Sequence, residues 1–361
     1  MAKPRLVAAV VALSAAFAAM GVQQRHEYTT TSTASVAPLA YVVGKTGLVQ
    51  IVDTRTGAVL AKADTGGRAT GVAVSPDGRR LYVVNGWTGA ITVVDPRTGA
   101  ILDRIFTQVQ LSHAAMRPDG QRLYVSAAGS VAVVDPENFR LVAAVKVGGG
   151  PQGLAVHPSN RVLYVANSQD GTVSLVDTAT ASQTSTIQVG GMPQFLAISP
   201  DGTRLYVSGM RLGDTTPGTL SVIDTTTNQV VGSVETGRGA GSIAVTPDGA
   251  TVYLTLPKDG EVVVVDAATM QVRERLPIDS PGVAIAPGDS RVFLATGATT
   301  TVLDSSNTVL ATYRMKTGEL EEARPRQFDA AMIAFPVAQP TATGLRTSSS
   351  NGSSRSSAGS S

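Results

Sequence analysis

Residues 71–106 read GVAVSPDGRRLYVVNGWTGAITVVDPRTGAILDRIF, and this stretch decides the fold. It holds four short apolar runs separated by turn residues: Gly71–Ser75, the Leu-Tyr-Val run from Leu81, Ala90–Val94 and Ala100–Phe106. In the turn that follows Ser75, Pro76 presets φ and Gly78 takes the positive φ that ends the turn. A second turn starts at Asp95, in the sequence DPRTG. The stretch therefore predicts four antiparallel strands joined by tight turns.

The same unit recurs along the chain, and three independent markers follow it. The steps between successive Tyr-Val-type triplets are 41, 42, 40, 42, 47 and 40 residues. The triplets begin at Tyr41, Tyr82, Tyr124, Tyr164, Tyr206, Tyr253 and Phe293. An Asp closes a later apolar run at Asp53, Asp95, Asp135, Asp177, Asp224, Asp266 and Asp304. A Pro ends a third run at Pro76, Pro118, Pro158, Pro200, Pro247, Pro287 and Pro336.

A four-stranded unit of roughly 40 residues is the blade of a β-propeller. The sequence thus predicts an all-β, seven-bladed propeller of four-stranded antiparallel blades over residues 39–337. The chain enters at a second strand (Ala40–Val43) and ends with an isolated first strand (Ala330–Phe335). We expect this last strand to pair in the first blade and close the ring, because closure removes exposed strand edges. An open solenoid, the alternative, needs no such complementary ends.

These units resemble the YVTN-type β-propeller repeat. The resemblance rests on Leu163-Tyr164-Val165-Ala166-Asn167, on Leu81-Tyr82-Val83-Val84-Asn85, and on the Ser-Pro-Asp-Gly and Val-Val-Asp-x-x-Thr-Gly turns. It covers roughly residues 39–337 and departs from the pattern at Phe293-Leu294-Ala295 and at Pro287-Gly288-Asp289. The resemblance implies the propeller fold and carries no general catalytic set.

The ends of the chain predict export. Lys3 and Arg5 precede the uncharged run Leu6–Met20, and Ala16-Phe17-Ala18 is a suitable cleavage triplet, so residues 1–21 are predicted to be a signal peptide. A retained membrane anchor is the alternative. Residues 22–38 follow as a spacer, and the Ser/Gly-rich residues 338–361 are predicted to be disordered. We therefore expect an extracytoplasmic protein, periplasmic or secreted, with no membrane span after cleavage.

Composition excludes several kinds of chemistry. The chain has no Cys, which excludes disulfides, Cys-ligated zinc, iron–sulfur clusters, covalently attached haem and a thiol nucleophile. The formal net charge is only +2, and removal of Lys3 and Arg5 with the signal peptide leaves the chain close to neutral. Nucleic acid, which binds basic proteins, is therefore an unfavourable partner. No close His pair or alternating Asp pattern predicts a metal site. The sequence predicts no cofactor and no metal, and we expect a monomer.

Propeller geometry places the regular Asp-bearing turns on one face and the irregular loops on the other. Sites favour irregular loops. The predicted ligand-binding residues on that face are Arg68, Trp87, His113, Gln152, Gln194, Arg211 and Arg238. Trp87 is the chain's only Trp, and a longer insertion in the fifth unit, Gly209–Gly218, should rise above the face.

Three functions stay open at this stage. The first is a non-catalytic binding or scaffold propeller for a protein or small-molecule partner. The second is a lactonase or other hydrolase with His113, Arg68, Arg238 and Asp279 at the mouth of the central channel, where Arg would stabilise an oxyanion. The third is a propeller partner of a redox enzyme. No Gly-x-Ser-x-Gly elbow accompanies His113, and the sequence favours binding over catalysis.

Overall fold

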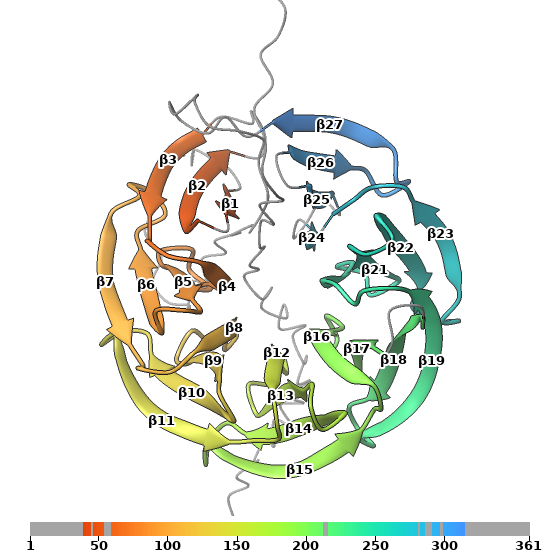
Figure 1. Ribbon diagram of the computed structural model, residues 1–361, viewed down its shortest axis with the longest axis horizontal. Helices are drawn as coiled ribbons and strands as arrows, with labels where there is room; N and C mark the ends of the chain where they lie inside the picture. Colours follow the sequence, from red (N-terminus) through yellow and green to blue (C-terminus); the bar gives the residue numbers. More distant parts are fainter. Residues whose placement is uncertain are drawn as a thin grey trace, which may run out of the picture.

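The protein is an all-β propeller of seven sheets arranged in a ring (Figure 1). The computed structural model describes residues 39–44, 46–53, 59–211, 216–280, 282–285, 291–296 and 299–314. Six sheets have four antiparallel strands, and the first has three described strands. In chain order the blades are β1–β3, β4–β7, β8–β11, β12–β15, β16–β19, β20–β23 and β24–β27. No helix occurs within the described ranges.

In every blade the strands follow one another outward from the ring axis in chain order. The innermost, or first, strands are β4 (Ala69–Val74), β8 (Leu111–Met116), β12 (Pro151–Val156), β16 (Met192–Ile198), β20 (Ile243–Val245) and β24 (Gly282–Ile285). The second strands are β1 (Leu39–Val43), β5 (Leu81–Asn85), β9 (Leu123–Ala127), β13 (Val162–Asn167), β17 (Arg204–Met210), β21 (Thr251–Leu256) and β25 (Val292–Thr296).

The two outer positions follow the same order. The third strands are β2 (Leu48–Asp53), β6 (Ala90–Val94), β10 (Ser130–Asp135), β14 (Thr172–Asp177), β18 (Gly218–Asp224), β22 (Glu261–Asp266) and β26 (Thr299–Leu303). The fourth strands are β3 (Val59–Asp64), β7 (Ile101–Phe106), β11 (Arg140–Lys146), β15 (Ser182–Gln188), β19 (Gln229–Gly237), β23 (Val272–Leu276) and β27 (Val309–Arg314).

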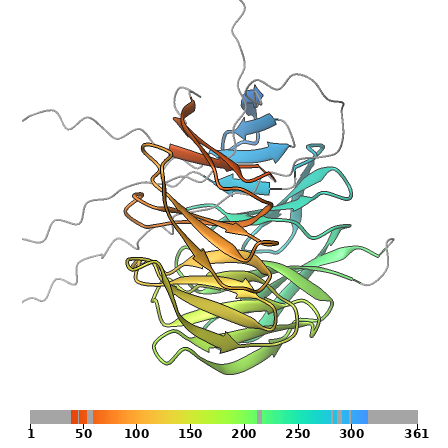
Figure 2. The same cartoon turned by 60° about the vertical axis from the view of Figure 1, so that its left-hand side comes forward.

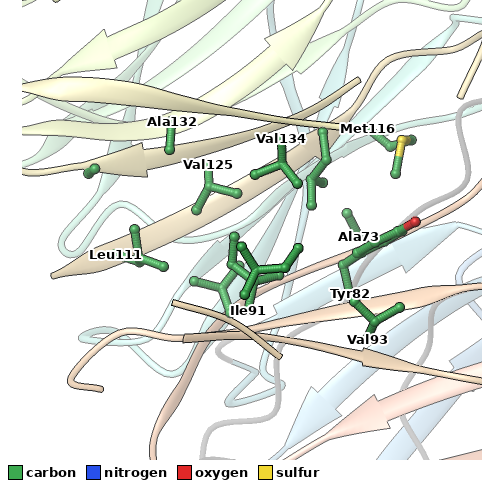
Figure 3. Close-up of a cluster of buried hydrophobic side chains, with 13 residues drawn as sticks. Ala73, Tyr82, Ile91, Val93, Leu111, Met116, Val125, Ala132 and Val134 are labelled. Carbon is green, nitrogen blue, oxygen red and sulfur yellow. The ribbon is translucent and has the colours of Figure 1, made fainter. Parts of the chain in front are cut away.

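The hydrophobic core lies between neighbouring blades. Second and third strands are buried on both faces, which is why they read as continuous apolar runs rather than as alternating ones. Between the second and third blades, Tyr82 and Ile91 face Val125 and Val134 (Figure 3). The buried Tyr82 hydroxyl donates a hydrogen bond to the Pro136 carbonyl of the next blade, 3.1 Å away. Apolar packing and such links between blades hold the ring together.

The fourth strands form the rim and carry a β-bulge at one repeated place. Opposite the third strand, the register shifts where each fourth strand begins, for example between Val93 and Val94, which leaves Leu102 as the extra residue. The same shift occurs in the other six blades. A bulge twists an edge strand and interrupts its hydrogen-bonding pattern, so it protects the rim from edge-to-edge pairing.

The predicted fold is confirmed as an all-β, seven-bladed propeller with antiparallel blades. The first and seventh blades lie next to each other in the ring (Figure 1). The predicted closing strand, residues 330–335, lies outside the described residues, as do the signal peptide, the spacer and the C-terminal tail. The part of the chain that the structure describes contains no apolar helix of membrane-spanning length.

Candidate functional site

The connections between strands gather on two opposite faces of the ring (Figure 2). The first, here the turn face, carries the turns between first and second strands and between third and fourth strands. The second, here the loop face, carries the loops between second and third strands and the links between blades. The two faces differ in regularity, and this difference locates the candidate site.

The turn face repeats one hydrogen-bonding arrangement. Asp177 Oδ1 accepts hydrogen bonds from the backbone N–H groups of Thr180 (2.7 Å) and Ala179 (2.9 Å), and the Thr180 bonds chiefly hold the pKa of Asp177 below its usual 3.8. The same bond to the N–H two residues ahead recurs at Asp95, Asp135, Asp224, Asp266 and Asp304. These carboxylates form turns, as the sequence predicts, and are engaged within the fold.

His157 also belongs to the turn face. Its Nδ1 accepts a hydrogen bond from the Ser159 backbone N–H at 3.0 Å, so the proton must reside on Nε2. Nε2 then donates to the Gly202 carbonyl of the next blade, 3.1 Å away. Burial lowers the pKa of His157 below 6.5. Nδ1 therefore stabilises the turn of His157 itself, and Nε2 joins this turn to the next blade.

His113 lies on the inner strand β8, near the ring axis. The corresponding residue is Gly153 on β12 and Phe195 on β16. Because Gly153 has no side chain, the His113 and Phe195 rings meet edge to face, with their centroids 5.0 Å apart. The side chain is half-buried, but its Nδ1 is fully buried and has no hydrogen-bond partner among the described residues. Burial lowers the pKa of His113 from 6.5 to about 4, so the ring is neutral at physiological pH.

The close approach of the neighbouring strand also requires glycine at position 153. A Cβ there would lie 2.7 Å from the Gln194 carbonyl oxygen and 2.9 Å from the Phe195 Cα, both on the neighbouring inner strand. Gly71 on β4 is similarly close to the backbone of β8. At Gly71 and Gly153 the neighbouring inner strand lies too close for any side chain. The His113 and Phe195 rings, at the corresponding positions of β8 and β16, fill the space that the glycines leave.

Gln152 and Gln194 lie on β12 and β16, each one residue nearer to the loop face than Gly153 and Phe195. Both residues are half-buried. Ser126 Oγ donates to the Gln152 backbone carbonyl, which fixes the backbone. Their side-chain amides make no hydrogen bond within the described part of the chain. Gln152, Gln194 and His113 therefore share one side of the ring, on β12, β16 and β8.

Arg211 and Arg238 lie on the fifth blade and on the link after it, where each forms an ion pair. Arg211 Nη1 lies 3.3 Å from Glu235 Oε1, and both side chains are exposed. Arg238 Nε donates to Asp259 Oδ1 at 2.7 Å, and the Arg238 backbone N–H donates to Asp259 Oδ2 at 2.6 Å. The carboxylate of Asp259 ties the link between blades to the loop after β21, so Arg238 has a structural role.

Arg68 and Trp87 are the one pair of predicted site residues in direct ring contact within the described residues. The Arg68 guanidinium lies over the Trp87 ring, 6.0 Å from its centroid. Trp87 is 75% exposed, in the loop between β5 and β6. Phe106 at the end of β7 is 65% exposed, and Val109 in the following link is 44% exposed. This group of residues on the loop face of the second blade is called the second-blade patch below.

The structure therefore separates the predicted site residues into three places. Arg68 and Trp87 stand on the second blade, His113, Gln152 and Gln194 on three inner strands, and Arg211 and Arg238 in ion pairs beyond them. Sequence reasoning missed Phe106, Val109 and the exposed Arg104 near them. The repeat itself carries the signal, since the positions that correspond to Phe106 hold Asp64, Lys146 and Gln188 in other blades.

Metal ligands are not gathered in the described part of the chain. It holds no group of three or more His, Asp or Glu side chains that could bind a metal ion.

Comparison with known proteins agrees with the fold. The family model of the cytochrome D1 heme domain matches residues 110–284, and that of the outer membrane protein assembly factor BamB matches residues 45–140. Neither match reaches half of the 361 residues. No curated protein matches the chain significantly.

Two solved structures extend this likeness. Hydrazine synthase of Kuenenia stuttgartiensis is 24% identical, with a TM-score of 0.62, over 68% of this chain and 86% of that chain. A functionally unknown protein from Desulfotomaculum acetoxidans is 16% identical, with a TM-score of 0.67, over 82% of this chain and 99% of that chain. At such identities the likeness establishes the propeller architecture alone.

Proposed function

We propose that this chain is an extracytoplasmic, YVTN-type propeller that binds a partner on its loop face. The observation that carries the proposal is the contrast between the two faces. On the turn face, the carboxylates and His157 are engaged in repeated turns. On the loop face, Trp87 projects into solvent beneath the Arg68 guanidinium. Trp and Arg are the residues that most often dominate binding energy at interfaces.

The extracytoplasmic location rests on two supports. The charged N-terminus and the uncharged run Leu6–Met20 have the pattern of a signal peptide. The matched BamB model is named for outer membrane protein assembly, a process outside the cytoplasm. We propose cleavage after the predicted residues 1–21, which leaves the propeller between a spacer and a polar tail.

A lactonase or hydrolase function has weaker support. It needs His113, Arg68, Arg238 and Asp279 to converge on one substrate. Arg68 stacks on Trp87, Arg238 is paired with Asp259, and Asp279 is exposed in the link before β24. His113 has no carboxylate partner within the described residues to orient it as a general base. Binding is therefore the function that the geometry favours.

The match to a heme domain raises the question of a haem group, and the described histidines do not fit one. A ligating histidine presents one nitrogen to the iron and donates its other N–H to an acceptor. Both nitrogens of His157 are engaged in turns. His113 Nδ1 is buried and has no acceptor within the part of the chain that the structure describes. We therefore propose a binding role that needs no haem.

Site-specific photocrosslinking in the source organism tests the proposal. A photoreactive amino acid at Gln110, exposed on the loop face, is compared with one at Arg97, exposed on the turn face. We expect a defined protein adduct in the extracytoplasmic fraction from the Gln110 position alone. Adducts from the Arg97 position alone, or a chain that stays in the cytoplasm with its first 21 residues attached, would contradict the proposal.

A further inference from the structure

Exposed large hydrophobic side chains in the described residues fall into two groups. Most repeat from blade to blade, because they lie where a fourth strand begins, at or next to its bulge. This repeating group contains Leu60, Ile101, Leu102, Leu141, Val142, Val230, Val231, Val309 and Leu310. The fold explains it, since the outer strands have a solvent-facing side in every blade. Trp87, Phe106 and Val109 form the second group, which belongs to the second blade alone.

Phe106 is an exception within the repeat. It pairs with Ala90, the first residue of the third strand. The residues that pair with this position in other blades are polar: Asp64 opposite Leu48, Lys146 opposite Ser130 and Gln188 opposite Thr172. An outer strand can therefore be built with a polar residue at this end. Packing of the blade does not explain an exposed Phe here.

Val109 and Trp87 are exceptions in the same way. The Thr107 N–H donates to the Gly89 carbonyl just as the Thr65 N–H donates to the Gly47 carbonyl, so Val109 corresponds to Gly67. The same bonds from Val147 and Val189 align Val109 with Gly149 and Gly191. In the loop after the second strand, Trp87 corresponds to Gln169 and Lys258. Three apolar residues therefore replace glycine or polar residues on one blade.

The segments that carry these three residues are bonded to one another. The Thr107 backbone N–H donates to the Gly89 carbonyl at 2.9 Å, and the Leu111 N–H donates to the Gly86 carbonyl at 3.2 Å. The loop 86–89 that holds Trp87 is thus fixed against the link 107–111 that holds Val109. On its other side, Thr88 lies against Gly67, next to Arg68. The backbone segments that carry the patch are therefore held together.

Two guanidinium groups border the patch. Arg68 lies over Trp87, and Arg104 Nη1 lies 3.7 Å from the place where a Cβ on Gly66 would be. Neither guanidinium forms an ion pair with a described residue, whereas Arg211 and Arg238 do. The nearby carboxylates bond to backbone instead, Asp64 to the Gly66 N–H and Asp103 to the Arg104 N–H. Two unpaired cations beside an apolar patch call for a carboxylate on the ligand.

We infer that the second-blade patch binds an extended segment of a partner protein that carries an aromatic or aliphatic side chain next to Asp or Glu. The inference rests on the proposed binding function and specifies its partner. Small molecules bind in concave sites that cover most of their surface. Trp87 and Phe106 project instead, which suits an extended segment that lies across them. Carboxylates of the segment pair with Arg68 and Arg104.

Peptide display on the purified, exported protein tests this inference without knowledge of the partner. A library of random 12-residue peptides, about the length of an extended segment that crosses one blade, is selected for binding to the immobilised chain. We expect the enriched peptides to combine Asp or Glu with Trp, Phe or Leu. Because Trp87 is the chain's only Trp, its fluorescence reports directly on whether a peptide that lacks Trp covers the patch.

Matched variants decide whether the contact is the inferred one. Trp87→Ala is expected to weaken binding of the enriched peptides by about 30-fold. Arg68→Gln combined with Arg104→Gln is expected to weaken it by about 10-fold and to reduce its salt dependence. Leu141→Ala on the rim and Arg97→Gln on the turn face are the controls and should bind as the wild type does.

Other outcomes overturn the inference. Peptides without acidic residues, peptides that bind Trp87→Ala unchanged, or no enriched peptides at all each count against it. Polygalacturonate serves as an anionic glycan probe, and a Trp87 response to it alone would assign the patch to acidic sugars. If crosslinking from Gln110 captures a partner whose binding survives the Trp87 and arginine variants, the proposed function stands and this inference fails.

Discussion

Tyr82 and Tyr124 occupy the same place in adjacent blades, yet their hydroxyl groups have different environments. Tyr82 donates to the Pro136 carbonyl, whereas the buried Tyr124 hydroxyl has no well-formed hydrogen bond among the described residues, and the Thr178 side chain near it interacts only weakly. Burial raises the pKa of Tyr82 to about 12, so the hydroxyl keeps its proton. Removing a bonded hydroxyl loses the bond, while removing an unpaired one relieves a desolvated polar group.

Replacing each tyrosine by phenylalanine should therefore give opposite results. Tyr82→Phe is expected to lower the free energy of unfolding by about 0.5–1.5 kcal/mol. Tyr124→Phe is expected to leave it unchanged or to raise it. Urea denaturation of the two variants measures both. Equal losses would mean that the Tyr124 hydroxyl finds a partner in solution, such as a buried water.

His113 predicts a dependence of stability on pH. Its pKa is lowered by burial from 6.5 to about 4, so the unfolded chain binds a proton more readily than the folded one. The contribution of His113 to stability is complete above pH 6.5 and is lost as the pH falls toward 4. The full shift corresponds to about 3 kcal/mol, and the partial exposure of the side chain makes this an upper limit.

His113→Phe should reduce this loss, because Phe195 already fills the corresponding position of the fifth blade. Unfolding by urea is measured on both sides of pH 6.5 in the variant and the wild type. His157, whose pKa is also lowered by burial, contributes to the remaining change. Turn carboxylates such as Asp177 act at lower pH, because their pKa lies below 3.8 and their stabilisation is lost only as the pH falls through it. An identical pH profile in the variant would show that the ring is not buried as described.

At the scale of the element, three links between blades have a left-handed residue at the same place. Gly66 and Gly190 have φ values of 70° and 75°, in the left-handed region that favours glycine. Gln108 occupies the same place in the link after β7, with a φ of 61°. An exposed Gln there has no packing that compensates for the strain. The second blade thus keeps this backbone conformation but places a non-glycine residue in it.

Exchanging glycine and non-glycine residues at this place tests the strain. Gln108→Gly is expected to raise the free energy of unfolding by about 0.5–1 kcal/mol. Gly190→Ala is expected to lower it by about 1 kcal/mol, from the backbone alone, because no atom lies within 4 Å of the added Cβ. Thermal or urea unfolding checks both. A stabilising Gly190→Ala would refute the left-handed conformation of the link.

The sequence predicted these elements unevenly, for physical reasons. The turns were predictable because Pro, Asp and Gly act locally, and the Asp177 bonds confirm them. The bulge that leaves Leu102 unpaired was not, because an extra residue in an exposed strand hardly changes the apolar pattern. Trp87 was found by its rarity. Phe106 was missed because a single Phe in an outer strand reads as ordinary, and only the register shows that it replaces polar residues.

At the scale of the whole molecule, the site depends on a comparison among blades. The loops and links of the predicted residues could be assigned to the loop face from topology, since connections alternate between two faces in any such sheet. Their grouping was not predictable, because Arg68 and Trp87 meet across two segments, whereas Arg211 and Arg238 find acidic partners whose positions only the folded ring fixes. Seven similar blades provide internal controls, so the exceptional second blade identifies the patch.

Closure of the ring is the remaining whole-molecule prediction. The first blade has three described strands, and β1 pairs on one side only, with β2, whereas the second strand of every other blade pairs on both sides. Residues 330–335 have the apolar pattern of an inner strand and lie outside the described residues. If they pair with β1, about five hydrogen bonds at ~1 kcal/mol each stabilise the seam.

Deleting residues 327–361 should then lower the free energy of unfolding by several kcal/mol, whereas deleting residues 340–361 should leave it unchanged. Urea denaturation of the two truncated proteins measures the difference, and equal stability of both with the full chain would show that the ring is held without its C-terminal strand.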